Sequence, residues 1–308
     1  MPNSKSQRLP LIKPPRLRPG ALIGVISPAG PVDESELKPD LELLESSGLR
    51  IHIAPHVYDR HDYLAGDDAA RLSDFHAMFR NTEIRAIFCA RGGYGTLRLL
   101  DRIDYDLIRE HPKIIVGYSD ITALLMAITK KTGLVTFHGP MVRGFSALHD
   151  NSREGLFKLI SSDQPVSFSP MAGNSLISGR ATGPLIGGNL SLICHLIGTP
   201  FLPSLDGCIL FIEDRGEPLY RIDRMLTHLA LAGQLKEISG LIGGEFMDCG
   251  DPSDIDTLLK TLASDLKIPL TTGFPVGHGP QNTALPLGIP TRLDADLMTL
   301  ATLEPCVI

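Results

Sequence analysis

The chain has 308 residues, of which 43% are hydrophobic and 21% charged, and its formal net charge is −6. This length exceeds the usual size of one domain, so two domains are expected. The acidic balance argues against nucleic acid or an anionic membrane as the main partner. The five cysteines are odd in number and include no C-x-x-C pair, which favours reduced thiols over disulfides or a metal cluster.

The first 20 residues are basic and rich in proline, and we expect them to form an extended arm on the surface. They lack the apolar stretch and the small-residue cleavage site of a secretory signal. No apolar run in the chain approaches the ~20 residues that cross a bilayer. We therefore expect a soluble, cytoplasmic protein with no membrane partner.

Residues 21–150 alternate short apolar strands with helices, which predicts a doubly wound, flavodoxin-like parallel sheet. A ligand of such a sheet binds beyond the carboxyl ends of its strands. The turns at 27–30, 90–95 and 117–120 each follow a strand, so we expect them to converge on one crevice. Strands are expected at 22–27, 50–54, 85–90, 113–116 and 135–137, and helices at 34–47, 67–80, from 96 onward and, as an amphipathic helix, at 121–132.

The pattern loosens at residues 151–183, which are rich in serine and proline, and we interpret them as a linker. Shorter strands then follow at 208–212, 241–245, 290–293 and 298–303, together with a few helices. This mixture predicts a smaller, β-barrel-like β/α domain over residues 184–308.

A serine stands between the strand at 113–116 and the helix at 121–132, in the tetrad Gly117-Tyr118-Ser119-Asp120. A tight turn there would expose Oγ at the sheet edge and aim the first N–H groups of the helix at whatever Oγ attacks. Ile121 replaces the second glycine of the G-x-S-x-G pattern, so the match is incomplete. Ser119 could instead simply cap the helix, and the tetrad taken alone favours that interpretation.

The segment Arg91-Gly92-Gly93-Tyr94-Gly95 also joins a strand to a helix. It lacks the G-x-G-x-x-G spacing and the Walker lysine, so a nucleotide site is poorly supported. Gly93 could present its N–H as an oxyanion donor, or the glycines could serve the turn alone. The sequence favours neither interpretation over the other.

A nucleophilic serine needs a base, and the base needs a group that orients it. Among ten histidines, His138 ends a strand and His278 lies between two glycines, and spacing alone does not choose between them. Glu213 closes the strand at 208–212 and alternates with inward apolar positions, so we expect it to point into the interior or a cleft, although it could equally form a structural ion pair with an arginine. No spacing typical of a metal site is present. The other acidic candidates are Asp214 and Glu217, and the possible arginine partners are Arg215, Arg221 and Arg224.

Taken together, these residues resemble the LD-carboxypeptidases, serine peptidases that trim murein tetrapeptides, and their relatives the microcin C immunity peptidases. The resemblance extends from Ser27-Pro28 to about Gly288 and rests on short segments in a specific order. In chain order these are Arg91-Gly92-Gly93-Tyr94-Gly95, Gly117-Tyr118-Ser119-Asp120-Ile121-Thr122, Gly187-Gly188-Asn189-Leu190, Ile197-Gly198-Thr199-Pro200, Ile212-Glu213-Asp214, Glu217, Tyr220-Arg221-Ile222-Asp223-Arg224-Met225-Leu226, Gly277-His278 and Leu285-Pro286-Leu287-Gly288.

The resemblance implies a Ser-His-Glu triad in which Ser119 is the nucleophile, His278 the general base and Glu213 the group that holds the imidazole. It also implies an oxyanion hole made by the N–H groups of Gly93 and Asp120. Family members often carry glutamate directly after the base, where this chain has Gly279. Because of this departure, the sequence does not show which group helps to hold the imidazole of His278, but the proposed triad is unaffected.

A carboxypeptidase must also bind the terminal carboxylate of its substrate, for which Arg91 and Arg215 are our candidates, with Tyr94 as a further substrate contact. An amino group on the substrate could meet one of three acidic residues, among which nothing in the sequence selects. These are Asp62, Asp67 and Asp68.

The expected function is release of D-alanine from murein tetrapeptides during cell-wall recycling, without a metal or cofactor and, as in the family, by a homodimer. Hydrolysis of an aminoacyl-nucleotide amide, as in microcin C immunity, is the alternative. The immunity enzymes tend to be longer and carry an added loop with an aromatic residue, whereas this chain has no tryptophan and no obvious insertion. A non-catalytic module that binds a small anion is the third hypothesis.

Overall fold

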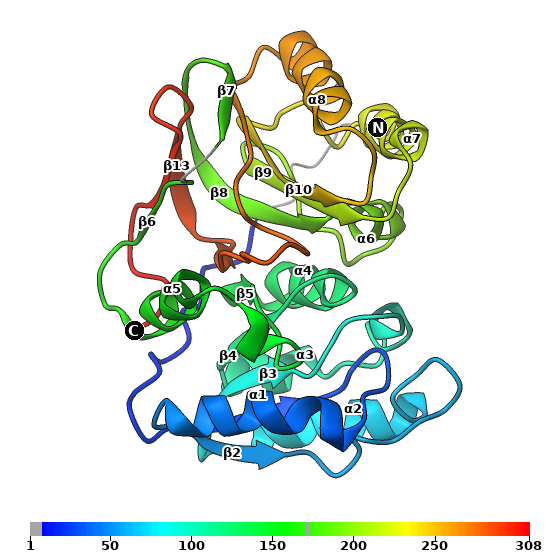
Figure 1. Cartoon of the computed structure of the whole chain (residues 1–308), viewed down its shortest axis with the longest axis vertical. Coiled ribbons are helices and arrows are strands. Elements are labelled where there is room, and N and C mark those ends of the chain that lie inside the picture. The colour runs from blue at the N-terminus through cyan, green and yellow to red at the C-terminus, as the bar shows by residue number, and fades with distance from the viewer. Residues whose placement is uncertain (1–7, 171–172) are drawn as a thin grey trace.

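The structure, a computed structural model, describes residues 8–170 and 173–308 and contains two sheets, one in each half of the molecule (Figure 1). The first sheet has the order β12-β5-β4-β3-β1-β2. Strands β1 to β5 are parallel, and their order is that of flavodoxin-like sheets, as predicted. The strands are β1 (Leu22–Ile26), β2 (Arg50–Ile53), β3 (Ile84–Cys89), β4 (Ile114–Gly117), β5 (Thr136–His138) and β12 (Leu285–Leu287). The accompanying helices are α1 (Glu34–Ser46), α2 (Asp68–Arg80), η1 (Thr96–Arg98), α3 (Tyr105–Glu110), α4 (Ile121–Thr132), η2 (Phe145–Ala147) and α5 (Asp150–Ser161).

The second sheet has the order β6-β14-β13-β8-β9-β10-β11-β7 and is mixed, which agrees with the predicted C-terminal β/α domain. Its four central strands, β8 to β11, are parallel, and the strands on both sides of them are antiparallel. The strands are β6 (Ser167–Phe168), β7 (Asn174–Ile177), β8 (Arg180–Asn189), β9 (Ile209–Arg215), β10 (Gly240–Met247), β11 (Leu270–Thr272), β13 (Pro290–Asp294) and β14 (Thr299–Thr302), and the helices are α6 (Leu190–His195), α7 (Leu219–Leu231) and α8 (Pro252–Leu266).

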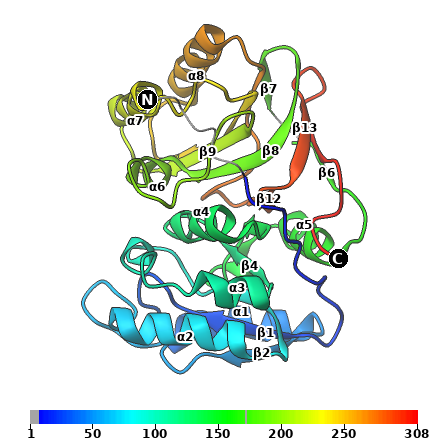
Figure 2. The same cartoon turned by 180° about the vertical axis from the view of Figure 1, so that it is seen from behind.

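Helix α4 lies between the two sheets in both views (Figures 1 and 2). Every residue from Ile121 to Ile128 is buried, so the prediction of an amphipathic helix was wrong for its first two turns. The physical reason is that the first sheet covers one side of the helix while β8 and α6 cover the other. A helix enclosed in this way is apolar all round.

The chain returns to the first sheet after β11, because β12 pairs with β5 in antiparallel fashion. The sequence analysis did not predict this return. Residues 273–284 therefore cross from the second sheet to the first, and they carry His278 to the junction of the two halves.

Residues 8–20 of the N-terminal arm form no helix and contact the segment after α4 and the C-terminal end of the chain. Residues 1–7, which the sequence analysis also assigned to this arm, lie outside the described residues. Ile12 exchanges backbone hydrogen bonds with the segment after α4, and Arg16 donates its N–H to the carbonyl of Ile308 at 2.8 Å. Lys13 pairs with Glu304 at 2.7 Å. Within residues 8–170 and 173–308, no helix has both the length and the apolar character needed to cross a membrane.

Candidate active site

Ser119 occupies a strained turn between β4 and α4. Its φ is +62°, a left-handed conformation that is uncommon for a residue with a side chain. The N-cap of α4 is Asp120, so the interpretation of Ser119 as a simple cap is not supported. Gly117 is required before the turn, since a Cβ there would lie 2.6 Å from the side chain of Ile121. A serine held under strain at a strand–helix junction is typical of an exposed nucleophile.

The glycine loop after β3 faces Ser119 directly. A Cβ on Gly92 would lie 3.1 Å from the Oγ of Ser119, so this glycine is needed for the close approach. The loop is held by the N–H of Gly30, which donates to the carbonyl of Gly92 at 3.2 Å. Three of the expected turns thus converge, as the parallel sheet predicted.

The backbone N–H groups of Gly93 and Asp120 are among those at this point that have no hydrogen-bond acceptor in the described part of the chain. The turn of Asp120 is fixed to η1, because its carboxylate accepts from the N–H of Thr96 at 2.9 Å and its carbonyl accepts from the Thr96 hydroxyl at 2.7 Å. Burial raises the pKa of the Asp120 carboxyl. Free N–H groups on two anchored loops, one at a helix N-terminus, can stabilise an anion.

Glu213 and His278 form a buried pair at the carboxyl end of β9. The Nδ1 atom of His278 lies 2.8 Å from Oε2 of Glu213, whose side chain is fully buried, whereas that of His278 is 10% exposed. Burial raises the pKa of the Glu213 carboxyl, and the hydrogen bond from His278 opposes this. A Cβ on Gly277 would lie 2.8 Å from the same Oε2 atom, which explains why a glycine precedes the histidine.

The other acidic candidates have different partners. Asp214 accepts from Asn189 Nδ2 at 2.9 Å and from the N–H and hydroxyl of Ser191, at the start of α6. Glu217 forms a surface ion pair with Arg221 at 3.3 Å. Of the three acidic residues, only Glu213 meets a histidine.

The ring of Tyr118 stands next to both candidate histidines. Its centroid lies 4.9 Å from that of His278 and 6.0 Å from that of His138, with edge-to-face geometry in both cases. His138 is fully buried, and neither of its ring nitrogens has a partner among the described residues. Burial lowers the pKa of His138 to about 3, so it remains neutral near pH 7. This environment is that of a packed core residue.

Sequence analysis missed Glu245, which lies on β10 beside β9. Its N–H donates to the carbonyl of Val276 at 2.9 Å, and its carboxylate accepts from the N–H of Gly279. A Cβ on residue 279 would lie 1.9 Å from Oε2 of Glu245, so Gly279 leaves room for this carboxylate. Burial raises the pKa of Glu245, and the nearby His278 lowers it. The signal was present, since Glu245, like Glu213, ends an expected strand and parallel strands end at one edge.

A pocket of about 190 Å³ borders His278 and Tyr118. Arg143, which the sequence analysis did not single out, lines this pocket and pairs with Glu36 of α1 at 2.8 Å. Arg143 lies in an irregular loop, and no motif or periodic pattern in the sequence marks it.

The predicted substrate-binding residues lie in different surroundings. The half-buried Arg91 donates to the carbonyl of Pro31 at 3.0 Å. Tyr94 is exposed and stacks edge-to-face on Tyr63 with centroids 5.5 Å apart. Arg215 lies 3.5 Å from Asp248 at the end of β9.

Two of the three acidic residues suggested for a substrate amino group already have partners. Asp67 caps α2 by accepting from the N–H of Ala70 at 2.7 Å. Asp68 is held by Arg71 and by Arg98, the latter at 2.8 Å. Asp62 is exposed and has a positive φ of 52°.

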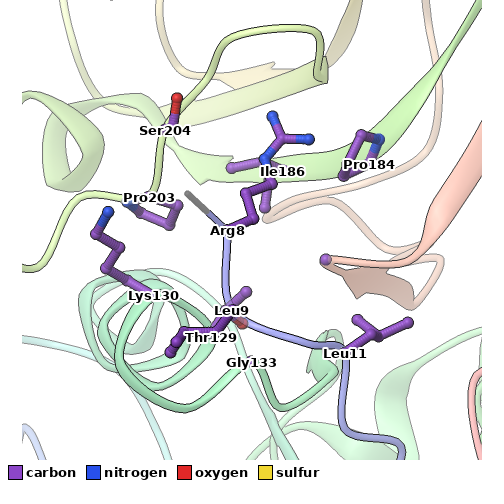
Figure 3. Close-up of a pocket in the computed structure, with 11 residues that line it drawn as sticks. Arg8, Leu9, Leu11, Thr129, Lys130, Gly133, Pro184, Ile186, Pro203 and Ser204 are labelled. Carbon is purple, nitrogen blue, oxygen red and sulfur yellow. The ribbon is translucent and has the colours of Figure 1, made fainter. Parts of the chain in front are cut away.

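A second pocket lies at the opposite end of α4, between that helix, the arm and β8 (Figure 3). Thr129 and Lys130 line it from the C-terminal end of α4, whereas Ser119 precedes the N-terminal end. This pocket is therefore separate from the site around Ser119.

Comparison with known proteins places this arrangement in a family. The model of the LD-carboxypeptidase N-terminal domain matches residues 23–139, and that of the C-terminal domain matches residues 182–293. A probable murein peptide carboxypeptidase of Bacillus subtilis is 42% identical over 90% of this chain and 89% of its own length. A putative carboxypeptidase of Streptomyces coelicolor is 39% identical over 96% of this chain and 98% of its own. The crystal structure of an MccF-like protein from Bacillus anthracis superimposes with a TM-score of 0.90 at 28% identity, covering 94% of this chain and 99% of that one. The chain belongs to the LD-carboxypeptidase family.

Proposed function

We propose that the chain is a serine-type LD-carboxypeptidase that removes the terminal D-alanine from murein tetrapeptides in the cytoplasm during cell-wall recycling. The observation that carries this proposal is the buried Glu213–His278 pair at the junction where Ser119 is held at a positive φ. In this proposal Ser119 is the nucleophile, His278 the general base and then acid, and Glu213 the group that orients the imidazole.

In the proposed reaction these groups act in turn. The Ser119 Oγ attacks the carbonyl before D-alanine, and His278 takes the hydroxyl proton. The N–H groups of Gly93 and Asp120 stabilise the oxyanion, and the N-terminal end of α4 favours the same negative charge. His278 then donates its proton to the leaving amine, D-alanine departs, and a water activated by His278 hydrolyses the acyl-enzyme.

Hydrolysis of an aminoacyl-nucleotide amide is the alternative substrate assignment, favoured by the likeness to the MccF-like structure. Both reactions use a serine acyl-enzyme, so the site geometry suits either. The chain has no tryptophan to stack on a base, which favours the murein substrate.

The test is release of free D-alanine from a murein tetrapeptide by the wild-type protein, by Ser119→Ala and by the matched control Ser47→Ala, which changes an exposed serine after α1. We expect release by the wild type and the control and none by Ser119→Ala. If the wild type releases no D-alanine but hydrolyses an aminoacyl-nucleotide amide, the alternative holds. Equal release by Ser119→Ala would overturn the nucleophile assignment.

A further inference from the structure

The pocket beside His278 is formed by two loops that come from different parts of the chain. One follows β5 and the other is the crossing between β11 and β12. Its volume is about 190 Å³, which accommodates a small amino acid. Its lining includes Tyr118, Met141, Arg143, Leu148, His278 and Asn282.

The ring nitrogen of His278 that transfers the proton determines which part of a substrate lies beside this pocket. Because Nδ1 of His278 is engaged by Glu213 at 2.8 Å, the proton moves through Nε2. A general acid must lie within hydrogen-bond reach of the leaving amine. The departing residue therefore lies against the imidazole, whereas the acyl part stays on Ser119. This pocket borders His278.

Arg143 gives the pocket a cationic group. Its Nη2 atom donates to Oε1 of Glu36 at 2.8 Å, and no other described side chain accepts from its guanidinium. An arginine has five N–H donors, so the remaining ones can bind a second carboxylate.

Acidic and basic groups are interspersed around Arg143, where the buried carboxylate of Asp40 accepts from the N–H groups of Gly144 and Ser146 in the same loop. Arg60 pairs with Asp33 at 3.1 Å and Arg143 with Glu36 at 2.8 Å. Arg91 adds a guanidinium whose partner is a carbonyl, that of Pro31. Burial lowers the pKa of Arg91, and the positive charge of Arg143 lowers it further.

We propose that this pocket binds the departing D-alanine and that Arg143 binds its carboxylate. The inference rests on the proposed function and adds the residue that makes the enzyme a carboxypeptidase. A peptide whose last residue lacks a free carboxylate loses this contact, so the pocket favours cleavage at the chain end.

The experiment compares two substrates, a tetrapeptide with a free D-alanine carboxylate and the same peptide with a C-terminal amide. Tripeptide formation from each is measured by chromatography for the wild type and for Arg143→Met. We expect the wild type to prefer the free acid by about 10- to 100-fold in kcat/KM, as for one hydrogen bond between charged groups. The preference should appear mainly in KM, because the contact exists before and during the reaction. Arg143→Met should cleave both substrates alike.

Arg60→Met serves as the matched control, since Arg60 belongs to the same charged corner but does not line the pocket. It should keep the preference for the free acid. If Arg143→Met keeps that preference too, the inference is wrong although the proposed function stands. If the wild type cleaves neither peptide, the proposed function itself fails.

Product inhibition gives a second measurement that needs no variant, should Arg143→Met fold poorly. Free D-alanine should inhibit the wild type at concentrations at which D-alaninamide does not. Equal inhibition by the two compounds would overturn the assignment of Arg143. A larger product, D-phenylalanine, should inhibit less than D-alanine if the pocket accepts only small residues.

Discussion

The ring of Tyr118 contacts two histidines that lie in opposite environments. His278 lies in a loop between the two halves of the molecule, its side chain is 10% exposed, and its Nδ1 atom lies 2.8 Å from the Glu213 carboxylate. His138, by contrast, ends β5 and is completely buried; its ring lies 5.2 Å from that of Phe211, centroid to centroid, and has no polar partner among the described residues. Both histidines follow or precede a glycine in the sequence, so their chemistry is decided by surroundings and not by local pattern.

The comparison shows what makes a histidine a useful base. A buried carboxylate stabilises the imidazolium that forms during the reaction, and slight exposure lets the other ring nitrogen reach a substrate. His138 has neither, and burial therefore disfavours its charged form. A neutral imidazole without partners acts as a packing group.

The largest expected effect separates the two histidines by activity. His278→Ala should lower kcat by about 10⁶-fold, as removal of the base does in serine peptidases. His138→Leu should leave kcat within about 10-fold of the wild type, because it replaces an unpartnered buried group by an apolar one. Steady-state rates of D-alanine release give both numbers. If kcat decreased by a similar factor in both variants, His278 and His138 would not differ in function as proposed.

The next effect distinguishes the two carboxylates around His278. Glu213→Gln should lower kcat by about 10⁴-fold, since the amide leaves the imidazole in the wrong tautomer. Glu245→Gln keeps a hydrogen-bond acceptor for the N–H of Gly279 but removes the charge, and we expect a loss of about 10-fold at neutral pH.

The pH dependence of the rate tests the role of Glu245 further. Its pKa is raised by burial, so the carboxylate becomes neutral at a higher pH than an ordinary glutamate. The ratio of the wild-type rate to the Glu245→Gln rate should therefore approach one at acidic pH and increase as Glu245 ionises. A ratio that stays constant across the pH range would show that the charge of Glu245 has no part in the reaction.

The smallest expected effect concerns stability. The folded pKa of His138 is about 3, below its ordinary value of 6.5, so the unfolded chain binds a proton that the folded chain excludes. Stability from this residue is complete above pH 6.5 and falls as the pH decreases toward 3, by about 2 kcal/mol at pH 5. His138→Leu should remove this dependence. Urea unfolding of the wild type and of His138→Leu at pH 7.5 and pH 5 measures this dependence. If both proteins lose the same free energy of unfolding between the two pH values, His138 does not contribute the expected pH dependence.

Local patterns were sufficient for much of the fold. The strands and helices of the first half follow from short apolar runs and helical spacing, and the helix predicted at 121–132 has those bounds in the structure. The convergence of the three turns also followed, because parallel strands place their carboxyl ends at one edge. The amphipathic character of that helix was predicted wrongly, since its second covering layer comes from β8 and α6, far along the chain.

The sequence by itself determined the alternation of strands and helices, the turn that carries Ser119 and, through family resemblance, the identity of the proposed triad. Only the tertiary structure decided that the chain returns to the first sheet at β12, which carries His278 between the two halves. It also decided that Glu245 occupies the space beside Gly279 and that Arg143 lines the pocket next to the imidazole. These contacts join residues that are distant in sequence. A local pattern cannot predict them, because it does not specify which distant side chain packs against a given residue.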